Sequence, residues 1–188
     1  MKQNRDFRSI EYLKHGTGKQ RECYRALSSL RIFEILAPYA PVLVGTFPLG
    51  IEVEGSDLDI VCQTDDLLEF RNLMEKEFSR FSDFSVKISG EKDVLTCNFM
   101  AENFPVEVYA SAQDPLLGNG YRHMRIEYRL LDLLGDTFKE EIIVLKKAGI
   151  KTEPAFARAL GLDGDPYRAV LALENWPDDR LKSLYKVK

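Results

Sequence analysis

Cysteine is scarce in this chain, and its placement argues against a disulfide-linked scaffold. Only three cysteines occur in 188 residues, namely Cys23, Cys62 and Cys97, and no two of them form a Cys-x-x-Cys pair. Each lies in an apolar stretch, where a free cysteine behaves as a small hydrophobic residue. We therefore expect three reduced, buried thiols in a cytoplasmic protein.

Long apolar runs and an excess of positive charge are also absent. No stretch is long enough to span a membrane, and Met1–Asp6 lacks the apolar segment of a signal peptide. The net charge of −4 argues against a dedicated nucleic-acid-binding protein, which normally carries a basic patch. A hydrophobic content of 45%, with no internal repeat, is typical of a globular protein with a real core.

Two short predicted strands and the loop between them organise the chain. The first, Val42–Val44, ends at Gly45-Thr46, and after ten further residues Asp57 and Asp59 open the second. Side chains alternate between the two faces of a strand, so both carboxylates point the same way. They repel each other unless a cation lies between them, and oxygen ligands of this kind suit Mg²⁺. The Gly-Thr step adds backbone N–H groups and a hydroxyl for a triphosphate.

An Asp-x-Asp pair at the start of an exposed strand is often merely solvated, so a third carboxylate matters to this interpretation. Glu107 lies in a later strand-like run, where it takes the opposite face from Val106 and Val108. A strand buried on both faces would carry an apolar residue at this position. The three carboxylates together therefore favour a metal-dependent site for a nucleoside triphosphate, with Ser56 placed to orient Asp57.

These residues resemble the motif of the nucleotidyltransferase superfamily typified by DNA polymerase beta. In that superfamily a Gly-Gly or Gly-Ser step precedes the paired carboxylates, and a third carboxylate on a later strand completes the site. The chain is more closely similar to a bacterial family of uncharacterised nucleotidyltransferase-like domains, over Val42–Cys62, Tyr121–Glu127 and Lys151–Phe156. It departs from the superfamily pattern at Thr46, which replaces Gly or Ser, and at Glu107, which replaces the commoner Asp.

The resemblance implies a reaction and a set of ligands. Asp57, Asp59 and Glu107 would bind two Mg²⁺ ions, with Mn²⁺ as a substitute, and Glu107 could instead act as the general base. A nucleoside monophosphate would pass from a nucleoside triphosphate to a hydroxyl acceptor. Gly45, Thr46 and Ser56 would bind the nucleotide. Further candidates for nucleotide binding are Arg122, His123 and Arg125. The acidic charge favours a small molecule or a protein as acceptor over nucleic acid, and no membrane partner is expected.

Two other functions are compatible with the same residues. One is a catalytically inactive module that binds a nucleotide or a protein partner, which the departures at Thr46 and Glu107 keep open. The other is a metal-dependent phosphohydrolase that uses water as the acceptor. The first predicts binding without turnover, whereas the second predicts phosphate release without any acceptor.

The order of predicted elements indicates an α+β fold: a nucleotidyltransferase-like mixed β-sheet with helices on one face, followed by a C-terminal helical layer. Alternating patterns leave the other face of the sheet open, with the carboxylates on it. We expect an N-terminal arm (1–19), an α/β core (20–115) and a C-terminal helical region packed on that core (116–188). Predicted strands span 42–44, 57–62, 84–89, 93–100 and 105–110. Predicted helices span 20–37, 65–78, 136–148, 152–160 and 166–173, with another from 121 and a polar tail from 178.

Charged residues of the helical region carry less specific signals. Arg122 and Arg125 share one stripe of the helix that begins at Tyr121, where a solvated face and a phosphate-binding face are equally compatible with the pattern. His123 could orient a carboxylate or the acceptor.

The cluster of Lys146, Lys147 and Lys151 has an ordinary explanation. Cations are favoured at the C-terminal end of a helix, and the pattern favours this interpretation over a phosphate contact.

Overall fold

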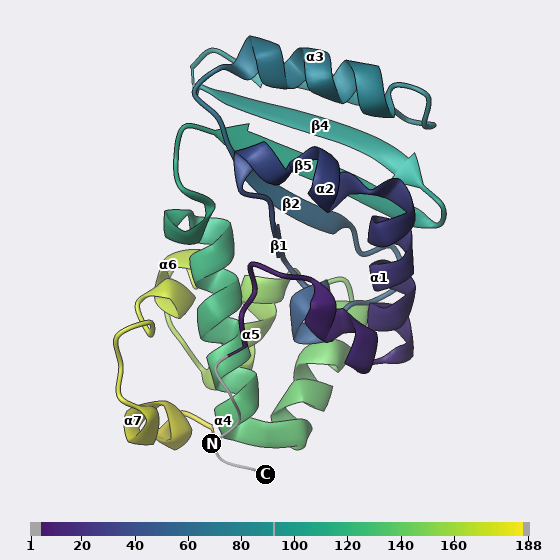
Figure 1. Cartoon of the computed structure of the whole chain (residues 1–188). Helices are drawn as coiled ribbons and strands as arrows, with labels where there is room; N and C mark the ends of the chain where they lie inside the picture. Colours follow the sequence, from purple (N-terminus) through teal and green to yellow (C-terminus); the bar gives the residue numbers. More distant parts are fainter. Residues whose placement is uncertain (1–4, 92, 186–188) are drawn as a thin grey trace.

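A five-stranded mixed sheet lies at the centre of the computed structural model, which describes residues 5–91 and 93–185 (Figure 1). Its strand order is β1-β2-β5-β4-β3. Strands β2 and β5 run parallel, and the other neighbouring pairs are antiparallel. This confirms the predicted α+β class. The strands are β1 (Val42–Val44), β2 (Leu58–Gln63), β3 (Ser85–Ser89), β4 (Val94–Ala101) and β5 (Phe104–Ser111).

Seven α-helices occur in the described residues, and most lie where the apolar periodicity predicts them. They are α1 (Gly18–Leu30), α2 (Ile32–Ile35), α3 (Leu67–Phe78), α4 (Asn119–Lys147), α5 (Thr152–Leu160), α6 (Pro166–Leu171) and α7 (Asp178–Ser183). Short 3₁₀ helices span Glu11–His15 (η1), Ala37–Tyr39 (η2), Phe47–Leu49 (η3) and Pro115–Leu117 (η4).

Three details of the helices differ from the prediction. The helix predicted over 20–37 is divided, because Arg31 adopts a left-handed backbone conformation with φ 52°. The two helices predicted on either side of Gly135 are joined as α4, with a kink at that residue. Helix α7 occupies part of the predicted polar tail. Residues 1–4 of the predicted arm, Lys92 of a predicted turn and residues 186–188 lie outside the described residues.

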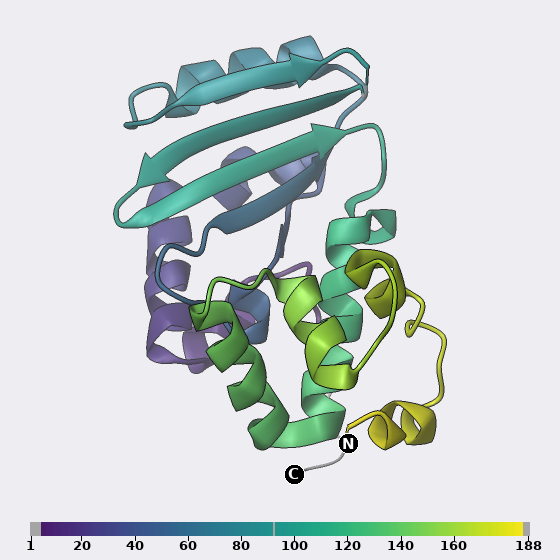
Figure 2. The ribbon, with the colours of Figure 1, turned by 180° about the vertical axis from the view of Figure 1, so that it is seen from behind.

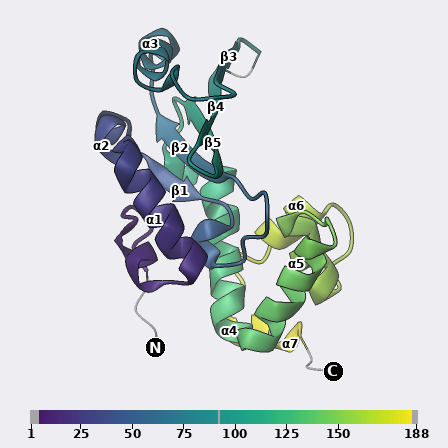
Figure 3. The same cartoon turned by 90° about the vertical axis from the view of Figure 1, so that its right-hand side faces the viewer.

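Alternation along the strands separates an apolar face from a polar face. Leu58, Ile60, Val106 and Val108 are buried in a hydrophobic cluster that includes residues of α1, α2 and α3. These helices therefore cover one face of the sheet, as predicted, and Figure 3 shows them on the same side of the strands. The side chains in between, among them Asp59, point toward the opposite, uncovered face.

The C-terminal helices build a second hydrophobic cluster, which joins the sheet through β1. Val42 and Val44 pack there with buried residues of α4, α5 and α6. Figures 1 and 2 show these helices together near β1 and β2, away from β3. Phe7 belongs to the same cluster, and its ring meets Tyr128 edge-on at a centroid distance of 5.1 Å. Helices α4 to α6 thus form a wall beside the uncovered face.

Two side chains from the N-terminal region hold the chain just after β1. The Nε2 group of Gln20 donates to the carbonyl of Phe47 over 2.7 Å, and an Arg5 guanidinium N–H donates to the carbonyl of Pro48 over 3.0 Å. Gln20 is only 5% exposed and also completes a capping box with Thr17 at the start of α1. Helix α1 therefore fixes the position of η3. Among the described residues, no helix combines the length and apolar character needed to cross a bilayer.

Removing the Gln20 amide should destabilise the protein. Gln20→Ala removes a buried hydrogen bond and the capping box of α1, although the Phe47 carbonyl keeps the Gly50 N–H as a donor over 3.2 Å. We therefore expect the free energy of unfolding to fall by about 1–2 kcal/mol. Urea denaturation followed by circular dichroism measures the change. The matched control is Gln63→Ala, because Gln63 Nε2 donates to the Ala112 carbonyl in an exposed position. Its loss should stay within about 0.5 kcal/mol, and equal losses in the two variants would contradict the anchoring role of Gln20.

Candidate active site

The parallel pairing of β2 with β5 brings the predicted carboxylates together. Asp59 and Glu107 are direct partners across these strands, so their side chains lie next to each other on the uncovered face. Asp57 is exposed and immediately precedes β2, two residues before Asp59. On the other side of β2, Val44 is the partner of Asp59, which places Gly45 beside the same carboxylate. The sheet register thus brings the three carboxylates together, although Asp57 and Glu107 are 50 positions apart in sequence.

All three carboxylates line a cleft of about 750 Å³ between the sheet and the C-terminal helices. The sheet and the loop before β2 supply the residues of one wall: Gly45, Thr46, Ser56, Asp57, Asp59, Glu107 and Tyr109. The opposite wall comes from α4, α5, α6 and the residue before α5: His123, Glu127, Lys146, Lys151, Thr152, Glu153 and Tyr167. The cleft is large enough for a nucleotide-sized ligand.

Burial, with a smaller contribution from neighbouring carboxylates, raises the pKa of Asp59 and Glu107 in this cleft. Removal from water is the largest cause that raises the pKa of Asp59 to about 8, and the charges of Asp57 and Glu107 add to it. Burial likewise raises the pKa of Glu107, with a further contribution from Asp57. Both shifts come first from burial, and the neighbouring negative charge adds to them without enough compensating positive charge. An oxygen-binding divalent cation would supply it, and these all-oxygen donors fit Mg²⁺.

Position 45 must be glycine because its backbone lies against the Asp59 carboxylate. Its backbone has φ 74°, a conformation that side-chain-bearing residues rarely adopt, and a Cβ atom built on it would collide with the Asp59 carboxylate. Thr46 follows in the turn that leads into η3, and its carbonyl accepts from the N–H of Leu49 over 3.1 Å. The glycine therefore lets the loop pass directly beside a carboxylate of the candidate metal site.

Ser56 closes the turn that delivers Asp57. The N–H of Val53 donates to the Ser56 hydroxyl over 3.0 Å, and the Ser56 N–H donates back to the Val53 carbonyl over 3.1 Å. The hydroxyl therefore shapes the backbone before β2 while the residue lines the cleft.

The structure does not bring the two candidate arginines to the cleft. Arg122 binds Glu174 through its guanidinium, with a shortest separation of 2.6 Å, and Arg125 is not among the residues that line the cleft. The third candidate of this helix, His123, does line it and is 7% exposed. Arg122 instead ties α4 to the segment after α6.

Lys146 lines the cleft, in addition to occupying the helix terminus that the sequence pattern predicts for it. Its amino group donates to the Thr152 hydroxyl over 2.8 Å, which connects the end of α4 to the start of α5. Burial lowers the pKa of Lys146, whereas the charges of Glu127 and Glu153, and more weakly Asp57 and Asp59, act to raise it. Its neighbour Lys147 is exposed and faces a different depression. No local pattern distinguishes these two lysines, so the sequence could not have identified Lys146.

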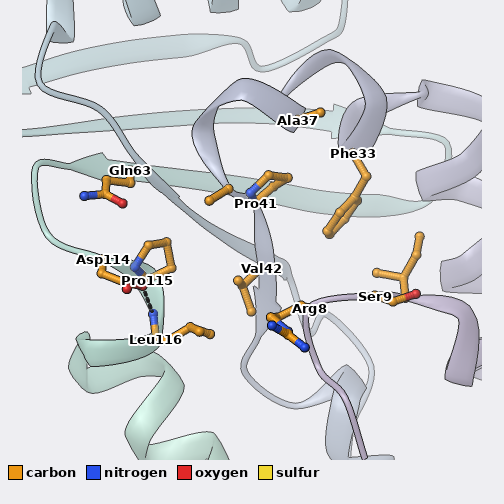
Figure 4. A pocket seen from close by; sticks show the side chains of 12 residues that line it. Arg8, Ser9, Phe33, Ala37, Pro41, Val42, Gln63, Asp114, Pro115 and Leu116 are labelled. Carbon is orange, nitrogen blue, oxygen red and sulfur yellow. Dashed lines mark hydrogen bonds between the residues drawn. The ribbon is translucent and has the colours of Figure 1, made fainter.

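A second cavity, of about 540 Å³, lies near the other side of β1 (Figure 4). Apolar side chains dominate its lining, including Phe33, Pro41, Val42 and Leu116, and Figure 4 shows Arg8 at its border. It contains none of the three predicted carboxylates. The chemistry suggested by the sequence is therefore confined to the first cleft.

Comparison with known proteins identifies a family and a fold. The family model described as "Domain of unknown function (DUF4269)" matches residues 25–173. A cytoplasmic RNA terminal U-transferase is similar in structure, with a TM-score of 0.51, 16% identity and coverage of 82% of this chain and 46% of its own. A Cid1 poly(U) polymerase mutant bound to MgATP gives a TM-score of 0.55 at 13% identity and coverage of 86% and 53%.

The polymerase core of the RNA surveillance complex TRAMP is a further structural neighbour, with a TM-score of 0.50, 14% identity and coverage of 93% and 58%. The chain thus has a nucleotidyltransferase-like fold and spans about half the length of these proteins. No curated protein matches its sequence.

The raised pKa of Asp59 predicts a pH-dependent stability of the metal-free protein. Asp59 has a pKa near 3.9 when unfolded and about 8 when folded, so the folded state binds more protons between these values. Stability is then greatest below pH ~4 and falls as the pH rises through about 8. Asp59→Asn should abolish this contribution and increase the free energy of unfolding at pH 8 by about 1–3 kcal/mol, since water in the open cleft reduces the effect.

Urea denaturation in EDTA at pH 5 and pH 8 measures this difference. Asp65→Asn is the control, because Asp65 is exposed and lies outside the cleft. Wild type and Asp65→Asn should lose stability between the two pH values more steeply than Asp59→Asn. Identical pH dependence in all three proteins would show that folding does not raise the pKa of Asp59.

Proposed function

The chain belongs to the DUF4269 family, a domain of unknown function, and we propose that it is a Mg²⁺-dependent nucleotidyltransferase. In this proposal it transfers a nucleoside monophosphate from a nucleoside triphosphate to a hydroxyl acceptor. The observation that carries the proposal is the convergence of Asp57, Asp59 and Glu107 on one wall of a nucleotide-sized cleft. Their proximity raises the free energy of the metal-free protein, which is the expected property of a site built for cations.

Each wall of the cleft has a part in the proposed reaction. Asp57, Asp59 and Glu107 would hold two Mg²⁺ ions, which neutralise the triphosphate and favour ionisation of the attacking hydroxyl. Gly45 and Thr46 offer backbone N–H groups to the phosphates, with Ser56 shaping the adjacent turn. Glu107, whose pKa is raised, is suited to accept the proton of the acceptor hydroxyl.

Lys146 and Lys151 would serve as phosphate ligands from the opposite wall, because both line the cleft. We do not include Arg122 and Arg125 in the proposal, since Arg122 is already paired with Glu174 and neither lines the cleft.

The acceptor of the proposed reaction is less closely defined than its nucleotide and its metal ligands. One structural neighbour is an RNA terminal U-transferase, and another is a poly(U) polymerase mutant bound to MgATP. This chain has a net charge of −4, which favours a small molecule or a protein as its acceptor. A phosphohydrolase that uses the same carboxylates is the second candidate, and it would release phosphate from a nucleoside triphosphate without any acceptor.

Nucleotide binding tests the proposal without knowledge of the acceptor. Calorimetry would use the four nucleoside triphosphates with a methylene group in place of the α,β-bridging oxygen, with and without Mg²⁺. We expect Mg²⁺-dependent binding by wild type and by the Asp65→Asn control. The double variant Asp57→Asn, Asp59→Asn should bind at least about tenfold more weakly, because it lacks two metal ligands. Absence of Mg²⁺-dependent binding in folded wild type would refute the proposal and favour a partner-binding module.

A pair of adjacent lysines tests the contribution of the helical wall. Lys146→Met removes a cation from the cleft, so the dissociation constant of the Mg²⁺–nucleotide complex should rise about tenfold, or about 1.4 kcal/mol. Lys147→Met is the matched control, because its exposed side chain lies outside this cleft and its removal changes the net charge equally. Calorimetry at one ionic strength compares the two. Equal weakening in both variants would indicate a general charge effect and remove Lys146 from the proposed site.

A further inference from the structure

Three potential metal ligands meet on the helical wall of the cleft, apart from the carboxylates of the sheet. His123 and Glu127 are one turn apart on α4, and Glu153 lies in the first turn of α5. A ligating atom from each of the three lies within 4.8 Å of the other two. His123 is 7% exposed and Glu127 is 3% exposed. The group is therefore a buried arrangement that joins two helices, in contrast to a solvated acidic surface.

Two polar atoms of this group have no hydrogen-bond partner. They are His123 Nδ1 and Glu127 Oε1, and both are fully enclosed. Buried polar side chains in folded proteins are nearly always paired, because an unpaired one forfeits its interaction with water. An unpaired imidazole nitrogen and an unpaired carboxylate oxygen in the same group of residues suggest that a component outside the protein chain completes their interactions.

The nearby lysine does not fill this role. The hydrogen bond of the Lys146 amino group goes to the Thr152 hydroxyl, and Glu127 Oε1 remains without a partner. Burial raises the pKa of Glu127 well above its ordinary value, the charge of Glu153 raises it further, and Lys146 opposes both effects only in part. One lysine thus faces two buried or half-buried carboxylates, and net negative charge remains.

We propose that His123, Glu127 and Glu153 form a binding site for a divalent transition-metal ion such as Zn²⁺. Such an ion lies about 2.0–2.2 Å from nitrogen and oxygen ligands, so its ligand atoms are separated by at most about 4.4 Å, close to the spacing found here. The imidazole distinguishes this site from that of Asp57, Asp59 and Glu107, because Mg²⁺ favours oxygen ligands and Zn²⁺ accepts nitrogen readily. This proposal stands independently of the proposed nucleotidyl transfer.

The position of the site defines its effect on the protein. An ion bound there cross-links α4 to α5, which form the wall opposite the catalytic carboxylates. The Tyr167 ring meets the His123 ring edge-on, at a centroid distance of 6.2 Å and an interplanar angle of 89°, which restricts the orientation of the imidazole. Three protein ligands leave one position of a tetrahedral ion for water or for a ligand in the cleft.

Calorimetric titration of the EDTA-treated, dialysed protein with ZnCl₂ tests the site. Wild type should bind one Zn²⁺ that is retained in the double variant Asp57→Asn, Asp59→Asn. Glu127→Gln and His123→Asn should each weaken that binding at least about tenfold, since even indirect partners of metal ligands alter affinity about 10- to 100-fold. His15→Asn is the matched control, because His15 is exposed and is the other of the two histidines in the chain. It should bind Zn²⁺ as wild type does.

Thermal unfolding separates metal binding from a structural role of the same residues. Zn²⁺ should raise the melting temperature of wild type and of His15→Asn, and should raise that of Glu127→Gln by clearly less at the same concentration. Glu127→Gln keeps the side-chain volume and removes a buried ionisable group, so its metal-free form should melt no lower than wild type. If it does not fold, His123→Asn and Glu153→Gln provide the same comparison.

The proposal fails if wild type binds no Zn²⁺, or if Glu127→Gln and His123→Asn bind it as tightly as wild type. It also fails if only the Asp57→Asn, Asp59→Asn variant loses binding, because the ion would then occupy the carboxylates of the sheet. None of these measurements uses a nucleotide. Failure of this proposal and failure of the nucleotidyltransferase proposal can therefore be distinguished.

Discussion

Repulsion between carboxylates in one cleft is the constraint on which this structure depends. Asp57, Asp59 and Glu107 lie on the sheet, and Glu127 and Glu153 face them from the helices. Burial makes their charge costly, which appears as a raised pKa for Asp59, Glu107 and Glu127. A fold that only had to be stable would replace such groups with apolar residues. The raised pKa values of these buried carboxylates are therefore the strongest physical argument for the proposed cation-dependent function.

The rest of the fold holds these groups close in spite of their repulsion. Parallel pairing fixes Asp59 opposite Glu107, and the apolar face of the same strands is packed beneath α1, α2 and α3. A shift of one residue in the register would turn the carboxylates into that core, so the packing protects their position. Gly45 permits the loop after β1 to approach Asp59, and Gln20 anchors the turn that follows. The repulsion between carboxylates is thus confined to the cleft, and packing in the rest of the fold offsets its cost.

The sequence predicts the sheet side of the cleft much better than the helical side. Alternation within each strand places Asp59 and Glu107 on the polar face, and this local pattern survives in the folded chain. Arg122 illustrates the opposite case, because its partner Glu174 lies 52 positions away and no short-range pattern identifies it. Lys146 likewise lines the cleft at the point where the end of α4 meets the start of α5, and its amino group donates there to Thr152. Residues whose role depends on how helices pack are the ones that periodicity cannot assign.

Lys146 connects the electrostatics of the two walls. Its charge interacts with Glu127 and Glu153 and also with Asp57 and Asp59. A cation bound at either carboxylate group would reduce the negative charge that this lysine compensates, and would leave its positive charge more available to the other group or to a phosphate. The two proposed sites are separate in their ligands, yet they share this counter-charge. Ion binding on the helical wall should therefore favour an anionic ligand in the cleft, since the ion and the lysine would act on it with the same sign.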